Sequence, residues 1–479
     1  MTEHVADPAT RRRATHDSDV PDALVAFMGG GWLDEPVDAR PHPQLSRHRE
    51  RRAELSPAYR GCYVLVPAGM EQARANDTFY RFRPSSDFAY LMGNGEPGAL
   101  LVMEPEGAGH RSLLFVREHN RGTRQFFTDR LQGELWVGRH RGVEESAAYY
   151  GVDACRSLRE LPAYLDELRA SPAARALIRG ADRAVDAALP PNDRDSDLAT
   201  HLAELRLVKD EYELAELRQA CALTAAAFTD VVRAMRRATN EREIEAAFWS
   251  RARIDANDVG YLTIAAAGRH TCTLHWTRND GVIAQGTLLL LDAGVERESL
   301  YTADVTRTLP VSGRYTPEQR AVYDVVWKAQ QAALAAVAPG NDFLEPNRRA
   351  MRVLAEGLIE LGILNVTLDE ALDPSNEFYK RYTLHNVSHM LGLDVHDCAR
   401  ARIEAYRYGT LREGMVLTIE PGIYLQPDDA TVPERFRGIG VRIEDDVAVT
   451  AGGVEILSSA LPTKADEIEA WIEKIWTAS

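Results

Sequence analysis

The amino-acid sequence predicts a mixed α/β protein with two domains. Three observations lead to this expectation. The chain has 479 residues, strand-like and helix-like segments alternate along it, and a turn cluster divides it at Pro190–Asp193. Domains commonly hold roughly 50–200 residues, so a chain of this length suits two, one of them large. A hydrophobic content of 45% supplies enough apolar material for a sizeable core.

The first part of the chain predicts an arm followed by an α/β domain. Residues 1–45 are polar and rich in glycine and proline, so we expect a flexible arm. Over residues 46–200, apolar runs typical of buried strands are followed by helix-like segments. The expected strands are 63–66, 99–103 and 112–116, and the expected helices are 157–169 and 181–189.

Residues 201–479 are expected to form the second domain, and an amphipathic linking helix should be its first element. Its alanine-rich segments are typical of helices, and its apolar runs end in polar, chemically active side chains. The expected helices are 211–237, 241–256, 317–338 and 343–362, and the expected strands are 287–293, 303–311, 415–420 and 439–450.

Charge and composition exclude several classes of function. The net charge of −16 disfavours binding to nucleic acid or to an anionic membrane, because both are negatively charged. No apolar stretch approaches the ~18 residues that a membrane span requires. Polar residues follow the basic cluster Arg11–Arg13 where a signal peptide would be apolar. The five cysteines are scattered without CxxC spacing, which is typical of reduced thiols, and we expect a cytoplasmic protein.

Two aspartates lie at the ends of candidate strands in the second domain. The apolar run 287–291 leads directly into Asp292, and the segment that carries Asp304 is expected to pair with it as a hairpin. A carboxylate at the end of a buried strand is unfavourable unless it is paired, protonated or bound to a metal. Each aspartate, considered alone, is more often a turn cap than a metal ligand. Two acids in one buried site repel each other, and a bound cation relieves that repulsion.

The same pattern recurs near the C-terminus. The apolar strand 415–419 ends in Glu420, and the segment 438–446 places Glu444 within a strand. Four buried acids in one domain are hard to explain as four independent turn caps. One shared metal site explains them all with a single assumption.

Candidate nitrogen ligands come from four histidines. His385 and His389 are four residues apart, but the zinc-protease pattern requires Glu after the first histidine and position 386 is Asn. His396 follows seven residues after His389, and His275 has the weakest individual signal. A single histidine of this kind is more often a hydrogen-bonded core residue than a ligand.

Five ordered motifs in this domain resemble those of one enzyme family. The motifs are LLLLDAGVE, YTADVTRTLPV, HNVSHMLGLDVHD, LTIEPGIYL and FRGIGVRIEDD, and NDTFYRFRPSSDFAYLMG in the first domain adds to them. Together they resemble the Xaa-Pro aminopeptidase (aminopeptidase P) branch of the pita-bread metallopeptidases. The resemblance implies a creatinase/aminopeptidase P-type α/β domain at the N-terminus and a pita-bread catalytic domain after it.

The resemblance also implies a site with two divalent metal ions. By this resemblance the metal ligands are Asp292, Asp304, His389, Glu420 and Glu444, with Asp304 and Glu444 bridging the two ions. Such a ligand set, dominated by oxygen, suits manganese, cobalt or magnesium, and the family points to manganese. Glu420 also resembles the group that moves a proton to the leaving nitrogen. His275, His385 and His396 resemble histidines that contact substrate, and Arg442 is placed to orient a ligand carboxylate.

The implied reaction is hydrolysis of the bond between an N-terminal residue and a following proline, by a hydroxide held between the two metal ions. The implied partners are peptides with proline at the second position, and the family implies a homo-oligomer, a dimer or tetramer. The alternative is a prolidase, which cleaves only dipeptides. Non-catalytic relatives lose metal ligands, whereas this chain retains all five. Ala89, Asn386 and Met390 depart from the family pattern and bear on fine specificity.

Overall fold

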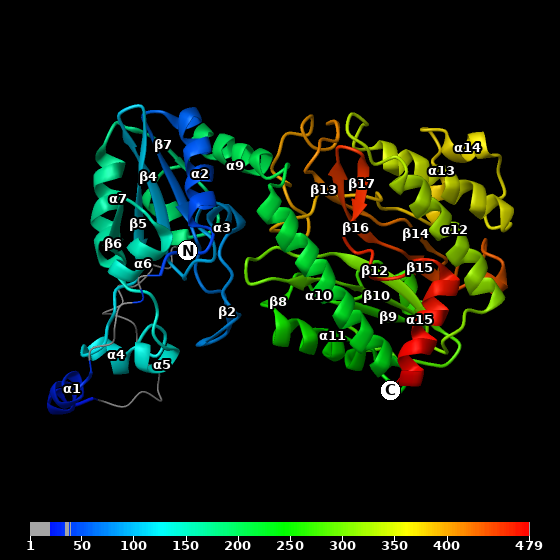
Figure 1. Ribbon diagram of the computed structural model, residues 1–479, viewed down its shortest axis with the longest axis horizontal. Helices are drawn as coiled ribbons and strands as arrows, with labels where there is room; N and C mark the ends of the chain where they lie inside the picture. Colours follow the sequence, from blue (N-terminus) through cyan, green and yellow to red (C-terminus); the bar gives the residue numbers. More distant parts are fainter. Residues whose placement is uncertain (1–19, 34–37, 39, 479) are drawn as a thin grey trace. The chain divides into compact units, whose positions relative to one another are not determined.

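The computed structural model describes residues 20–33, 38 and 40–478 (Figure 1). The chain forms two compact units, Met1–Pro191 and Asn192–Ser479. Within the predicted arm, residues 1–19, 34–37 and 39 lie outside the described residues. Asp22–Gly29 form helix α1, and the ring of Trp32 packs edge-on against Phe126 with the ring centroids 5.1 Å apart.

A five-stranded mixed sheet organises the first unit. Its strand order is β6-β5-β4-β1-β7, and the three central strands are antiparallel while β6 and β7 pair in parallel at the edges. The strands are β1 (Cys62–Pro67), β4 (Leu100–Glu106), β5 (Gly109–Val116), β6 (Ala154–Ser157) and β7 (Ala174–Leu177), and a small ribbon pairs β2 (Ala73–Ala75) with β3 (Thr78–Phe79). The apolar runs of the central strands are buried, as the sequence predicts, whereas the start of β5 and the end of β4 reach the surface.

Helices cover this sheet. Leucines of α7 and the apolar residues of α8 pack on sheet side chains such as Leu65 and Phe115 to form one core. The helices of the unit after α1 are α2 (Leu45–Leu55), α3 (Ser86–Met92), α4 (Arg124–Thr128), α5 (Glu134–Val137), α6 (Val143–Tyr150), α7 (Leu161–Ala170) and α8 (Arg183–Ala188). The predicted mixed α/β character of this region is confirmed.

The second unit contains two similar groups of helices and strands. In the first group, helices α10 (Glu211–Met235) and α11 (Glu241–Asp255) pack together beside the sheet β12-β10-β9, as Figure 1 shows in green. In the second, α12 (Pro317–Leu334) and α13 (Glu345–Glu360) pack together beside the sheet β13-β16-β17. One continuous apolar core joins both groups.

The strands of both groups and the other elements of this unit have the following bounds. The strands are β8 (Asp258–Val259), β9 (Ile264–Ala267), β10 (Leu288–Ala293), β11 (Val295–Glu296), β12 (Val305–Pro310), β13 (Val416–Ile419), β14 (Gly422–Tyr424), β15 (Gly440–Arg442), β16 (Asp445–Thr450) and β17 (Gly453–Ile456). The further helices are α9 (Asp193–Leu205), α14 (Leu368–Leu372) and α15 (Ala465–Ala478). Within the described part of the chain, no helix is long and apolar enough to cross a membrane.

The prediction of a single strand over residues 439–450 is wrong. The segment forms two strands, β15 and β16, which pair with β14 and β13 respectively and therefore belong to different sheets. The chain changes sheets at Ile443 and Glu444, where the Glu444 amide bonds to the Thr306 carbonyl of β12 at 3.1 Å. The acid therefore lies at a junction between sheets and not within a strand.

Candidate active site

Two paired strands bring the first two aspartates together. Strands β10 and β12 are antiparallel, with Asp292 opposite Thr306, so the predicted pairing of these segments is confirmed. Asp304 lies two residues before Thr306 and faces the same side. The Tyr261 hydroxyl bonds to an oxygen of Asp292 at 2.7 Å and to one of Asp304 at 2.5 Å. Both aspartates are buried, with exposed fractions of 8% and 5%.

The second group of strands supplies the two glutamates. Glu420 follows directly after β13, and Glu444 lies between β15 and β16. The Glu444 carboxylate accepts a hydrogen bond from the Thr306 hydroxyl at 2.6 Å. Because Thr306 belongs to β12, this bond joins the acid of the second group to the strand of the first.

The backbone beside β13 positions His389. Residues 387–389 run alongside this strand, with the Glu420 amide bonded to the Val387 carbonyl and the Thr418 amide bonded to the His389 carbonyl. His389 and Glu420 therefore lie next to each other although they are 31 positions apart in the chain. The segment that carries His385 and His389 is a loop and not a helix.

His389 faces a group of carboxylates. Its Nδ1 lies 3.2 Å from the Met390 carbonyl, and its Nε2 lies 3.3 Å from Asp304 and 3.5 Å from Glu420. A hydrogen bond from Nδ1 to the carbonyl leaves Nε2 to face the acids. One ligand atom from each of Asp304, His389 and Glu444 lies within 4.8 Å of the other two.

The electrostatics of the site favour a bound cation. Burial, reinforced by the neighbouring acids, raises the pKa of Asp292 and Glu444, and burial raises that of Glu420 to about 7. Although burial alone would lower it, the adjacent carboxylates raise the pKa of His389 to about 9. These groups repel one another as anions, and a divalent ion relieves that repulsion. The oxygen-rich donor set therefore fits divalent metal ions.

Arg442 contacts the first aspartate. Its Nη2 lies 2.5 Å from Asp292 Oδ2, its Nε donates to Thr306 at 3.1 Å, and its Nη1 donates to the Tyr424 hydroxyl at 2.9 Å. The Tyr424 hydroxyl oxygen also lies 2.8 Å from Nε2 of His385. One hydrogen-bonded chain thus connects His385 through Tyr424 and Arg442 to Asp292.

Of the other three predicted histidines, His385 lies beside Glu420 and His396 lies beside His389. His385 Nδ1 lies 3.4 Å from Glu420, and burial, with the charge of Arg442, lowers the pKa of His385 to about 4. The ring of His396 meets that of His389 edge-on, with the centroids 4.5 Å apart. His275 is exposed, and its charge helps to lower the pKa of both His385 and His396, whose largest cause is burial.

Four residues of this site were not predicted from the sequence: Tyr261, Thr306, Tyr424 and Asp446. Asp446 accepts the Asp304 backbone amide at 2.9 Å and thereby fixes the backbone at that aspartate. A signal for Thr306 was available, because it lies two residues after Asp304 and shares its face of the strand. Tyr261 and Tyr424 gave no such signal, because a tyrosine beside an apolar strand usually belongs to the core.

An α/β domain with a buried group of carboxylates and one histidine is characteristic of a metal-dependent hydrolase. The family model for metallopeptidase family M24 matches residues 215–451, and the model for the aminopeptidase P N-terminal domain matches residues 48–176. Each match lies within one of the two units.

Comparison with individual proteins narrows the class further. Xaa-Pro aminopeptidase 1 of Streptomyces coelicolor is 47% identical over 477 residues, which cover 98% of this chain and 96% of that protein. Aminopeptidase P from Escherichia coli with the inhibitor Pro-Leu has a TM-score of 0.82 at 32% identity and covers 91% of this chain and 100% of its own. A zinc-substituted form of the E. coli enzyme in complex with product has a TM-score of 0.81 at 32% identity, with 91% and 99% covered.

The chain therefore belongs to the Xaa-Pro aminopeptidase family of M24 metallopeptidases and is a metallo-aminopeptidase. The predicted fold class, an aminopeptidase P-type N-terminal domain followed by a pita-bread domain, is confirmed.

Proposed function

We propose that this enzyme removes the N-terminal residue from peptides whose second residue is proline, with two manganese ions held by Asp292, Asp304, His389, Glu420 and Glu444. The observation that carries the proposal is the convergence of ligand atoms from Asp304, His389 and Glu444 within 4.8 Å at the junction of the two strand groups. When bound, two such ions would polarise the scissile carbonyl and lower the pKa of water.

Glu420 is the proposed proton carrier. Its two carboxylate oxygens lie 3.5 Å from His389 and 3.4 Å from His385, so it stands between the proposed metal site and the histidines beside it. From there it would take a proton from the attacking water and deliver it to the proline nitrogen as the bond breaks.

The remaining predicted residues are proposed to bind and orient. His396, beside His389, would donate a hydrogen bond to the substrate carbonyl as negative charge develops on its oxygen, and His385, held by Tyr424, would contact the substrate. His275 would contact substrate from its exposed position. Arg442 would hold Asp292 in place through its bond to Oδ2.

The preference for proline follows from the chemistry of the bond. The peptide bond before proline is a tertiary amide without a hydrogen, so a peptidase devoted to it must recognise the ring instead of an N–H group. The alternative function, a prolidase, is less well supported, because the relatives described above are aminopeptidases. We further propose that the enzyme is cytoplasmic and forms a homo-oligomer, a dimer or a tetramer. Sedimentation of the purified chain would test the oligomeric state.

One assay tests the proposed activity and separates it from the alternative. The metal-depleted enzyme, reconstituted with Mn²⁺, should cleave Xaa-Pro-Yaa tripeptides at least as well as Xaa-Pro dipeptides. Xaa-Ala-Yaa peptides should be cleaved negligibly, and the metal-depleted enzyme should be inactive until manganese is restored. Cleavage of dipeptides alone would establish the prolidase reading, and full activity without metal would exclude the proposed site.

A further inference from the structure

A second group of metal-ligating side chains lies within the first unit. Atoms of His119, Glu134 and His140 lie within 4.8 Å of one another. All three come from the connection between β5 and α6, and Glu134 is the first residue of α5. Nδ1 of His119 lies 2.7 Å from Oε1 of Glu134, and Nδ1 of His140 lies 3.5 Å from the same oxygen. Both imidazoles thus direct the same ring nitrogen at one carboxylate oxygen.

The outer nitrogens of the two rings are already engaged. Nε2 of His140 lies 3.0 Å from the Glu118 carbonyl, which can only accept a hydrogen bond. Nε2 of His119 lies 3.1 Å from the Glu145 carboxylate, which also only accepts. Each Nε2 therefore carries the proton. In the neutral rings, both Nδ1 atoms then present a lone pair to Glu134.

Two lone pairs directed at a carboxylate require a positive charge between them. Two protonated rings would supply it, and so would a metal ion. A histidine that donates its outer N–H to a carbonyl or carboxylate is the usual arrangement around a bound metal.

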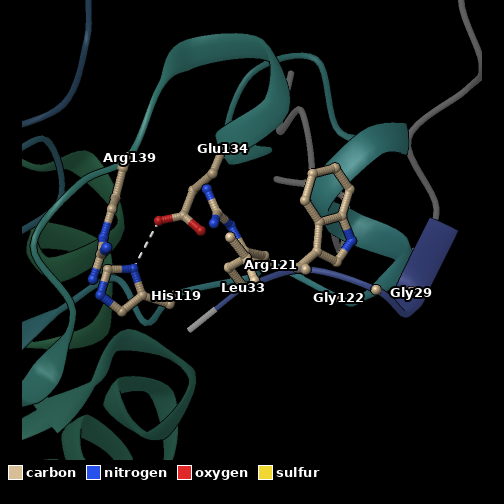
Figure 2. Close-up of a pocket in the computed structure, with 9 residues that line it drawn as sticks. Gly29, Leu33, His119, Arg121, Gly122, Glu134 and Arg139 are labelled. Carbon is tan, nitrogen blue, oxygen red and sulfur yellow. Dashed lines mark hydrogen bonds and ion pairs between the residues drawn. The ribbon is translucent and has the colours of Figure 1, made fainter. Parts of the chain in front are cut away.

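The local backbone is built to admit this arrangement. A Cβ atom at Gly142 would lie 2.4 Å from the His119 ring, so only glycine lets the ring take this position. Glu134 is itself held by the Asn120 amide at 3.2 Å, and its side chain is almost fully buried. His119 and Glu134 also line a cavity of about 330 Å³ with Arg121, Arg139 and Trp32. Figure 2 shows the Glu134 carboxylate and the His119 ring pointing toward each other at this cavity.

We propose that Nδ1 of His119, Nδ1 of His140 and Oε1 of Glu134 form a zinc-binding site in the N-terminal unit, separate from the proposed two-ion centre. Two imidazoles with one carboxylate match the donors that Zn²⁺ prefers, whereas manganese favours sites dominated by oxygen. Bonds of ~2.0–2.1 Å in a tetrahedral site separate ligand atoms by roughly 3.3 Å. The observed 2.7 and 3.5 Å lie on either side of this value. The bordering cavity leaves the fourth position to water or a small anion.

The test measures the number of zinc ions bound per chain in the full-length protein. Asp304→Asn and Glu444→Gln together disable the proposed two-ion centre and provide the background. After chelation, reloading with Zn²⁺ and gel filtration, this background should retain one zinc per chain by mass spectrometry of the metal. Adding His140→Gln or Glu134→Gln should remove it. Adding His110→Gln, in the same unit but bonded to Ser56 and Cys62, should leave it in place.

A graded variant separates metal binding from a purely structural role. Glu145→Gln removes the charge of the acceptor that faces His119 Nε2, an acceptor that also holds Arg139 and the Gly142 amide, and should weaken zinc binding roughly 10–100-fold without abolishing it. If the background variant does not fold, the unaltered chain should bind one zinc more than the His140→Gln chain. Equal zinc content in the chains with and without His140 or Glu134, or no zinc in the background at all, would overturn the proposal in favour of two protonated histidines. The test compares the zinc content of variants, so its outcome does not depend on the ligands assigned to the two-ion centre.

Discussion

Arg442 and Asp292 form a buried pair, with the guanidinium Nη2 2.5 Å from the carboxylate Oδ2. The two side chains are 150 positions apart and come from different sheets, Asp292 from β10 and Arg442 from β15. The guanidinium also holds Thr306 and Tyr424, and its planar fork allows one residue to engage all three partners. The pair therefore links the proposed ligand carboxylate to the sheet formed by β14 and β15.

The first prediction concerns this arginine. Arg442→Lys retains the charge, but an ammonium cannot span the three partners, so Asp292 should lose its fixed orientation. We expect kcat/KM and manganese affinity to fall roughly 10–100-fold while the fold is retained. Arg218→Lys is the control, since that arginine pairs with Glu455 at the surface. Unchanged kinetics and metal affinity in Arg442→Lys would show that the fork is not required.

The second prediction concerns the two proposed bridging acids. Asp304→Ala and Glu444→Ala should each abolish activity and lower the content of bound metal together, because each acid would serve both ions. Glu356→Ala, at the exposed surface of α13, should change neither quantity. Elemental analysis and peptide hydrolysis on the same preparations decide the matter. Full metal content with full activity in Glu444→Ala would exclude the five-ligand site.

The third prediction separates the two neighbouring histidines. His389→Ala should lose metal, since its Nε2 faces Asp304 and Glu420. His396→Ala should keep metal and fold but lower kcat roughly 10²–10³-fold, because its proposed hydrogen bond forms to the developing charge of the transition state. Metal content and steady-state kinetics of both variants are the measurements. A His396→Ala enzyme with unaltered kcat would remove this histidine from the mechanism.

The fourth prediction concerns stability and pH. His48 is buried in α2, its Nδ1 donates to the Tyr90 carbonyl, and burial lowers its pKa to about 3. The ring is therefore neutral in the folded state, whereas the unfolded chain binds a proton near its ordinary pKa of about 6.5. The stabilising contribution is complete above that value and is lost as the pH falls from it toward 3. Between pH 7.5 and pH 5 this loss is about 2 kcal/mol.

Urea unfolding of the unaltered chain and of His48→Asn at both pH values measures this contribution. Asn can still donate a hydrogen bond to the carbonyl but does not titrate. The difference in unfolding free energy between the two chains should therefore shrink by about 2 kcal/mol from pH 7.5 to pH 5. Between pH 7.5 and 8.5 it should stay constant. An equal difference at all three pH values would show that His48 does not remain neutral.

The sequence by itself determined the fold class and the pairing of strands β10 and β12 in the second unit. The apolar run 288–291 is buried on both faces, so its character can be read without the tertiary structure. Acids placed directly after such runs, like Asp292 and Glu420, indicate that the folded protein must supply a compensating positive charge. The helices of the second unit were also predictable, because the periodic spacing of their apolar residues is a local property of the sequence.

Only the tertiary structure decided which side chains share a partner. Tyr261, 43 positions before Asp304, bonds to it, and Thr306 reaches Glu444 across 138 positions. Local patterns carry no information on such contacts, because they join residues that meet only when the chain has folded. The same reason explains the break of the expected strand 439–450 at Glu444, where bonding to β12 replaces continuation of one sheet. It also explains why His119 and His140, each unremarkable in sequence, meet at Glu134 only once the loops between β5 and α6 have folded.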